Sequence, residues 1–164
     1  MDLSRLSTDL LFVALITVAN GAPWLLGRCF GVDQARPVDA GLRFADGRPL
    51  LGPSKTWRGL AAAMIATPIF ALLMGWPVWL GLAVGGAAMI GDLLASFLKR
   101  RLGLASSTSA PGLDQIPEAL LPVLVATFWL DLDWFDLGLV VWIFLIGHLL
   151  VTHLIPRLLR SDSY

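Results

Sequence analysis

Three short stretches of the chain concentrate side chains that could bind phosphate groups or a divalent metal ion. The first, Gly52–Gly59, reads GPSKTWRG and packs two cations and two hydroxyl groups into eight residues. Backbone N–H groups at a helix start point at a bound anion, and Ser54, Lys55 and Thr56 can add donors and charge. The spacing of a Walker A loop is absent. The stretch therefore predicts a phosphate site or, alternatively, an interfacial anchor with Trp57 in the aromatic belt.

The second stretch places Asp92, Ser96 and Lys99 within about 60° of arc on one face of a helix, at about 100° per residue. The same face carries small residues at earlier positions, which let a neighbouring helix approach closely (Ala88, Gly85 and Gly81). An ionisable side chain inside an apolar span is by default a functional hypothesis. The alternative is that Asp92 serves helix packing and is neutralised by Lys99.

The third stretch, Pro111–Glu118, places a turn and then Asp114 at the mouth of another apolar run. Asp114 and Glu118 could face a common cation. Mg²⁺ takes carboxylate oxygens from one or two residues and completes its shell with water and substrate phosphates, so two carboxylates suffice. Alternatively, Asp114 caps the helix and Glu118 interacts with the helix dipole.

The composition places these stretches in a lipid bilayer. The 164 residues are 57% hydrophobic and only 15% charged, with a mean hydropathy of +0.76, whereas about a quarter of a soluble domain is charged. The formal net charge is zero, and we expect no nucleic-acid partner. The single Cys29 excludes an internal disulfide and a cysteine-built metal site. His148 and His153 lie about 140° apart on a helix, so we expect structural or interfacial roles for both.

The uncharged runs predict an all-α integral membrane protein with five transmembrane helices in one domain, residues 1–164. The run Gly59–Gly91 has 33 residues and would extend about 50 Å, so it must turn back, at Gly75-Trp76-Pro77. The expected spans are residues 10–27, 59–74, 77–98, 117–134 and 137–156. In the first long loop, the Asp-Gly pair within Leu42–Arg48 predicts a small β-hairpin.

The distribution of basic residues predicts the orientation. Eleven of the twelve Lys and Arg residues lie in the loops 28–58 and 99–116 or at the C-terminus, and only Arg5 lies on the other side. Cytoplasmic loops carry the Lys and Arg excess. We therefore expect the N-terminus outside, both long loops in the cytoplasm, and the chain in the cytoplasmic membrane of the cell with its active site facing the cytoplasm.

The ordered set of three stretches on five predicted spans resembles the CDP-archaeol synthase family. Its second half is similar to the CTP:phosphatidate cytidylyltransferases, whose signature reads Ser-x-x-Lys-Arg, a gap, Pro-Gly, then Asp-Arg-x-Asp. Here Ser96-Phe-Leu-Lys99-Arg100 is followed by Pro111-Gly112-Leu113-Asp114-Gln115-Ile116-Pro117. The second Asp of the signature falls on Pro117, with Glu118 beside it.

The resemblance implies transfer of a cytidylyl group from CTP to a membrane lipid phosphate, with release of pyrophosphate and formation of a CDP-lipid. It implies Mg²⁺ as the cofactor and CTP, the lipid phosphate and the bilayer as partners. The implied catalytic residues are Asp92, Asp114 and Lys99, and the implied metal ligands are Asp92, Asp114 and Glu118. The implied substrate-binding residues are Ser54, Lys55, Thr56, Arg58, Ser96, Lys99, Arg100 and Gly112.

Two other classes of function compete with this interpretation. A non-catalytic membrane protein could bind anionic lipid headgroups through its basic loops, but such binding has no use for an intramembrane carboxylate at Asp92. A transporter is disfavoured because the five spans show neither halved symmetry nor a pair of broken helices. The identity of the lipid acceptor and the oligomeric state stay open.

Overall fold

The computed structural model describes residues 3–31, 35–106, 108, 110–130 and 132–161, with side-chain placement for residues 5–151 of these. Five helices occur in this part of the chain and no strand does. They are α1 (Leu3–Phe30), α2 (Trp57–Leu73), α3 (Val78–Arg101), α4 (Gln115–Ala126) and α5 (Trp134–Ser161). The predicted all-helical class is confirmed.

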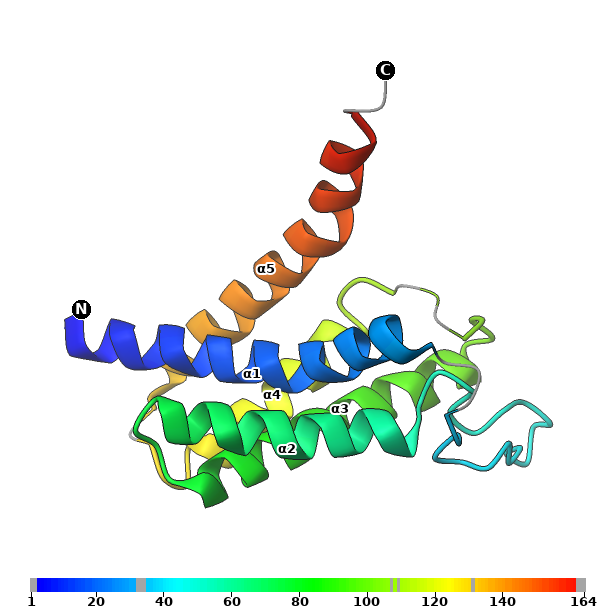
Figure 1. Ribbon diagram of the computed structural model, residues 1–164, viewed down its shortest axis with the longest axis horizontal. Helices are drawn as coiled ribbons and strands as arrows, with labels where there is room; N and C mark the ends of the chain where they lie inside the picture. The colour runs from blue at the N-terminus through cyan, green and yellow to red at the C-terminus, as the bar shows by residue number, and fades with distance from the viewer. Residues whose placement is uncertain (1–2, 32–34, 107, 109, 131, 162–164) are drawn as a thin grey trace.

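Helices α1 to α4 lie alongside one another, whereas α5 leaves the bundle at a steep angle (Figure 1). Helix α3 is central, because it packs against α4, α2 and α1. Its contact with α2 depends on Gly81, where an added Cβ would lie 2.4 Å from Pro68 Cα. The predicted close approach of a neighbouring helix to the small-residue face of α3 is thus confirmed.

Three helices are long and apolar enough to cross a bilayer: Arg5–Phe30, Val78–Arg101 and Trp134–Val151. Helices α2 and α4 are apolar but shorter, at 17 and 12 residues. Helix α4 ends at Ala126, before the expected boundary at residue 134, and turns follow it. The next helix then begins with its own cap, in which Asp133 Oδ1 accepts hydrogen bonds from the N–H groups of Phe135 and Asp136.

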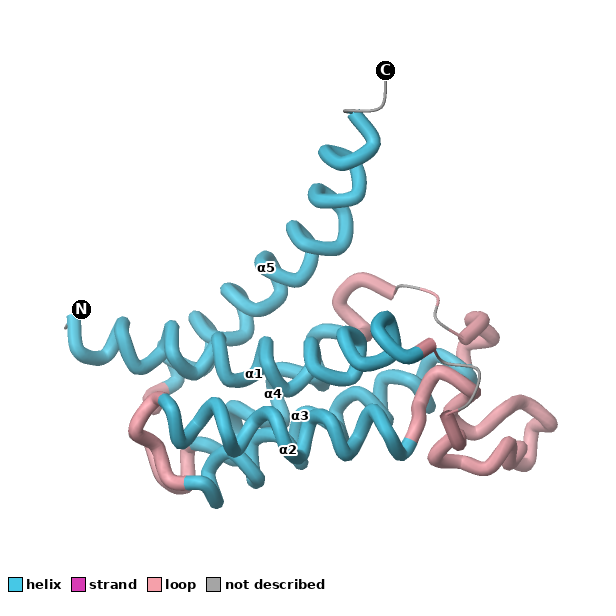
Figure 2. The backbone as a smooth tube through the Cα atoms, viewed as in Figure 1, coloured by secondary structure: helices cyan, strands magenta, loops and turns pink. Residues whose placement is uncertain are grey.

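The long loops at residues 35–56 and 102–114 gather at one end of the bundle (Figure 2). The β-hairpin predicted at Leu42–Arg48 is wrong, because only an isolated antiparallel bridge between Arg43 and Pro49 forms there. The N–H groups that would extend the pairing on either side bond elsewhere, that of Arg48 to Asp46 Oδ1 and that of Leu42 to Asp39 O.

The first loop is instead fastened to the end of α3 by side chains. The Arg101 guanidinium lies 4.8 Å from the ring centre of Phe44 and 5.0 Å from that of Phe97. It also forms an ion pair with Asp46 and donates to the carbonyl of Pro49. Cation–π contacts and charged hydrogen bonds therefore hold this loop against α3, directly beside the predicted site residues.

Candidate active site

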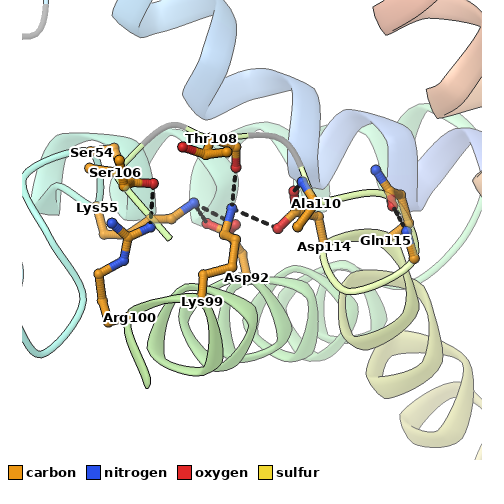
Figure 3. Close-up of polar contacts among 12 residues, drawn as sticks. Ser54, Lys55, Asp92, Lys99, Arg100, Ser106, Thr108, Ala110, Asp114 and Gln115 are labelled. Carbon is orange, nitrogen blue, oxygen red and sulfur yellow. Dashed lines mark hydrogen bonds and ion pairs between the residues drawn. The ribbon is translucent and has the colours of Figure 1, made fainter. Parts of the chain in front are cut away.

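The centre of the site is an ion pair between the first long loop and α3 (Figure 3). Nζ of Lys55 lies 2.5 Å from Oδ1 and 2.6 Å from Oδ2 of Asp92. Thr56, the N-cap of α2, accepts a hydrogen bond from Gly59 N at 3.2 Å and so fixes the chain direction next to Lys55. The alternative in which Lys99 neutralises Asp92 is wrong about the partner, because Asp92 pairs with Lys55.

A second carboxyl group reaches Asp92 from α4. Gly91 makes this possible, because a Cβ there would lie only 2.2 Å from the carbonyl oxygen of Pro117. With hydrogen alone at that position, the start of α4 packs directly on α3. Glu118 is consequently buried, with its carboxyl group beside that of Asp92. Two adjacent carboxylates repel each other when both are charged, and a bound cation relieves that repulsion.

A second ion pair lies beside the first. Nζ of Lys99 is 2.6 Å from Oδ1 of Asp114 and donates to the carbonyl of Thr108 at 3.2 Å. Oδ2 of Asp114 accepts from Ala110 N at 2.9 Å. Gly112, at φ +84°, forms the turn before α4, where its N–H donates to Gln115 Oε1. The described part of this loop is thereby held against Lys99.

The loop that carries Lys55 is shaped by a buried carboxylate. Asp39 accepts hydrogen bonds from the N–H groups of Leu51 and Gly52 at 2.9 Å and of Gly41 at 3.0 Å. Burial disfavours its charged form, yet these backbone hydrogen bonds outweigh burial and hold the pKa of Asp39 below its usual value. Ser54 then meets Ser106 of the second loop, Oγ to Oγ, at 3.0 Å.

These groups face one cavity of about 620 Å³. Its walls contain every predicted site residue except Gly112: Ser54, Lys55, Thr56, Arg58, Asp92, Ser96, Lys99, Arg100, Asp114 and Glu118. Arg100 is buried and donates to Ala105 O at 2.8 Å, while its Nε has no partner among the described residues. The structure thus brings the three sequence stretches together.

The sequence interpretation missed one wall of the cavity. Helix α1 contributes one stripe to it, which includes Asn20, Trp24 and Arg28 at helical spacing. Asn20 was a usable signal, because it is the one polar amide in an otherwise apolar run and lies four residues before Trp24. His148 of α5 also lines the cavity, whereas the side chain of His153 lies outside the described residues.

The carboxyl groups of the cavity are the candidate ligands of a metal ion. Among the described residues, no group of three or more His, Cys, Asp or Glu side chains lies close enough together to hold a metal ion. Asp92 is paired with Lys55 and Asp114 with Lys99, and the two carboxyl groups that lie next to each other are those of Asp92 and Glu118. Two carboxyl groups in contact, with space beside them for phosphate oxygens, suit Mg²⁺.

Comparison with known proteins agrees with this geometry. A family model described as CarS-like, CDP-archaeol synthase, matches residues 8–78 and 70–161. The CDP-archaeol synthase of Natronomonas pharaonis is 34% identical over 152 residues, covering 79% of each chain. That of Thermococcus onnurineus is 35% identical over 127 residues, covering 71% of each. That of Hyperthermus butylicus is 44% identical over 104 residues, which span 60% of this chain and 59% of the relative.

A solved structure, described as an intramembrane enzyme for archaeal membrane lipids biosynthesis, has a TM-score of 0.74 and 30% identity. The likeness covers 87% of this chain and 90% of that one. Apolar helices and this likeness together make the chain an integral membrane protein. It belongs to the CDP-archaeol synthase family, the CTP-dependent cytidylyltransferases that act on a lipid phosphate in membrane lipid biosynthesis.

Proposed function

We propose that the cavity transfers the cytidylyl group of CTP to the phosphate of an isoprenoid glycerol lipid, yielding a CDP-lipid and pyrophosphate. The observation that carries this proposal is the pair of adjacent ion pairs, Lys55–Asp92 and Lys99–Asp114, inside one cavity. Both substrates are polyanions, so a site that joins them must supply positive charge where they meet.

In the reaction, an oxygen of the lipid phosphate attacks the α-phosphorus of CTP in line with the departing pyrophosphate. One P–O bond forms, the bond to the β-phosphate breaks, and its electron pair leaves with pyrophosphate. The nucleophile is already an anion near neutral pH, so no general base is required. The residues of the cavity therefore act by binding and orientation.

Lys55, Lys99 and Arg100 bind phosphate oxygens, and each lysine exchanges its carboxylate partner for them when substrate enters. Ser54, Thr56 and Ser96 donate hydrogen bonds to the same groups, while Arg58 adds charge at the cavity wall. Arg100 is suited to this role because its buried Nε is not used within the described structure. Gly112 acts indirectly, through the turn that positions Asp114.

Mg²⁺ fits the carboxyl groups that the lysines release. Asp92 and Glu118 would hold it, with Asp114 available once Lys99 turns to phosphate. The ion would neutralise charge on the triphosphate and on the departing pyrophosphate. The basic loops favour a site that faces the cytoplasm, where CTP is available, in the cytoplasmic membrane.

The test is to incubate the purified chain with Mg²⁺, radiolabelled CTP and a panel of lipid phosphates, and to measure label in the organic phase. We expect label with an isoprenoid glycerol phosphate. Asp92→Asn and Asp114→Asn should abolish it while the melting temperature in detergent stays close to that of the wild type, because Asn keeps the size of the side chain. A protein that only binds lipid headgroups would give no label with any acceptor.

A further inference from the structure

The cavity has two separate sets of cations. The inner set, Lys55 and Lys99, is paired with carboxylates of α3 and of the loop before α4. The outer set is Arg28, in the last turn of α1, and Arg58, in the first turn of α2. Within the described residues, neither outer arginine forms an ion pair with Asp or Glu. Both guanidinium groups line the cavity, where an anion can approach them.

The outer arginines are held at the same end of α1. Arg58 donates a hydrogen bond to the carbonyl of Gly31, directly after α1. The Arg28 guanidinium lies 5.6 Å from the ring centre of Trp24, one helical turn earlier on the same face. Both side chains line the cavity that contains the inner set. An anion bound to them would thus share a space with a triphosphate on the inner lysines.

The surroundings of the outer set are those of a bilayer interface. Trp24 is 65% exposed, Phe30 70% and Trp57 59%, and all three lie at the ends of α1 and α2 that border the cavity. Exposed aromatic side chains at helix ends collect at the depth of lipid headgroups. A lipid phosphate is tethered to that depth, whereas CTP reaches the site from water.

We propose that Arg28 and Arg58, next to the Trp24 indole, bind the phosphate group of the lipid acceptor, while the inner lysines bind the triphosphate of CTP. This inference rests on the proposed function. It assigns the lipid phosphate to the outer set of cations and CTP to the inner set. A guanidinium presents two parallel N–H donors to a phosphate, which an ammonium cannot do. The exposed Trp24 indole then lies beside the apolar chains of the same molecule. The acceptor phosphate then enters beside α1, next to the α-phosphorus.

The first experiment measures steady-state kinetics of Arg28→Ala and Arg58→Ala in mixed micelles, varying one substrate at a time. We expect KM for the lipid phosphate to rise about tenfold or more and KM for CTP to change less than twofold. Arg28→Lys should be intermediate, because it keeps the charge and loses the fork. The matched control is Arg43→Ala, which removes an equal charge from an exposed turn outside the cavity.

A rise in KM for CTP instead of the lipid would assign the outer arginines to the nucleotide and overturn the proposal. So would losses no larger than in Arg43→Ala, since those reflect general attraction of anionic lipid to the basic loops.

The second experiment needs no turnover. Titration calorimetry of a short-chain dialkylglycerol phosphate, without nucleotide, should show binding to the wild type and at least tenfold weaker binding to Arg28→Ala, with CTP binding unchanged. Equal lipid-phosphate affinities would overturn the subsite. Normal binding in a wild-type protein that transfers no label would refute the proposed function while the subsite stands.

Discussion

Gly91 is the position at which one added methyl group should disturb the chemistry most. A Cβ there would lie 2.2 Å from Pro117 O, 2.6 Å from Pro117 C and 2.9 Å from Glu118 N. These are backbone atoms of the first turn of α4, so no side-chain rotation relieves the overlap. Helix α4 would have to withdraw by about 1 Å to reach ordinary van der Waals separation.

Two quantities should respond differently to Gly91→Ala. Overpacking of this kind costs about 1–3 kcal/mol in the free energy of unfolding, which the remaining packing of α3 against α1 and α2 can tolerate. A misplacement of about 1 Å in a catalytic group costs about a hundredfold in rate. Because Glu118 moves with α4 away from Asp92, we expect kcat/KM to fall by about that factor in protein that is still folded.

The assay compares label transfer per folded molecule with the melting temperature of the same detergent sample. Gly86→Ala is the matched control, since it adds the same methyl group to the same helix and meets nothing within 4 Å. We expect Gly86→Ala to retain full activity. If Gly91→Ala stays within threefold of the wild type, the close approach of α3 and α4 does not position the reacting groups, and the reasoning fails.

Four further predictions concern charge and orientation. Lys99→Ala should raise KM for CTP about tenfold or more, and Glu118→Gln should cause a partial loss of turnover that raised Mg²⁺ relieves; kinetics at two Mg²⁺ concentrations test both, and unchanged values would remove these residues from the site. The pKa of Asp39 is lowered in the folded protein, so its charged side chain stabilises the fold at pH values above 3.8, the usual pKa of Asp, and this stabilisation is lost as the pH falls through the folded pKa. The melting temperature of Asp39→Asn should therefore fall less between pH 7 and pH 3 than that of the wild type. Cysteines introduced at Trp134 and Ala105, with Cys29 replaced, should label from opposite sides of the membrane, and labelling from one side would contradict the predicted orientation.

The sequence predicts which residues line the cavity better than it predicts which of them form ion pairs with one another. Residue type and order identify Lys55, Asp92, Lys99 and Asp114 as site residues, because charged groups in an apolar chain have few other uses. Helical spacing places Asp92 and Lys99 on one face, which suggests that they pair. The loops decide otherwise, since the first brings Lys55 to Asp92 and the second brings Asp114 to Lys99. Such pairings depend on loop paths that periodicity does not encode.

Two further features depend on contacts between segments that are distant in the sequence. The hairpin expected at Leu42–Arg48 is replaced by turns that Asp39 and Arg101 stabilise from outside the segment. The contribution of α1 to the cavity has only one sequence signal, Asn20, because the rest of its residues look like an ordinary span. Only the packing of α1 against α2 and α3 turns the stripe that includes Asn20 and Arg28 toward the site.

The position of Glu118, one residue after the second acid of the cytidylyltransferase signature, has a physical explanation in this packing. A shift of one residue rotates a helical side chain by about 100°, which in general would carry an acid away from the site. Here the backbone of α4 comes closest to α3 at Pro117, which packs against Gly91. The next residue, Glu118, therefore lies beside Asp92. The missing hydrogen-bond donor of Pro117 costs nothing in the first turn of a helix, where such donors have no helical partner. The close contact between α3 and α4 therefore lets position 118 supply a carboxyl group that a bound cation beside Asp92 would require.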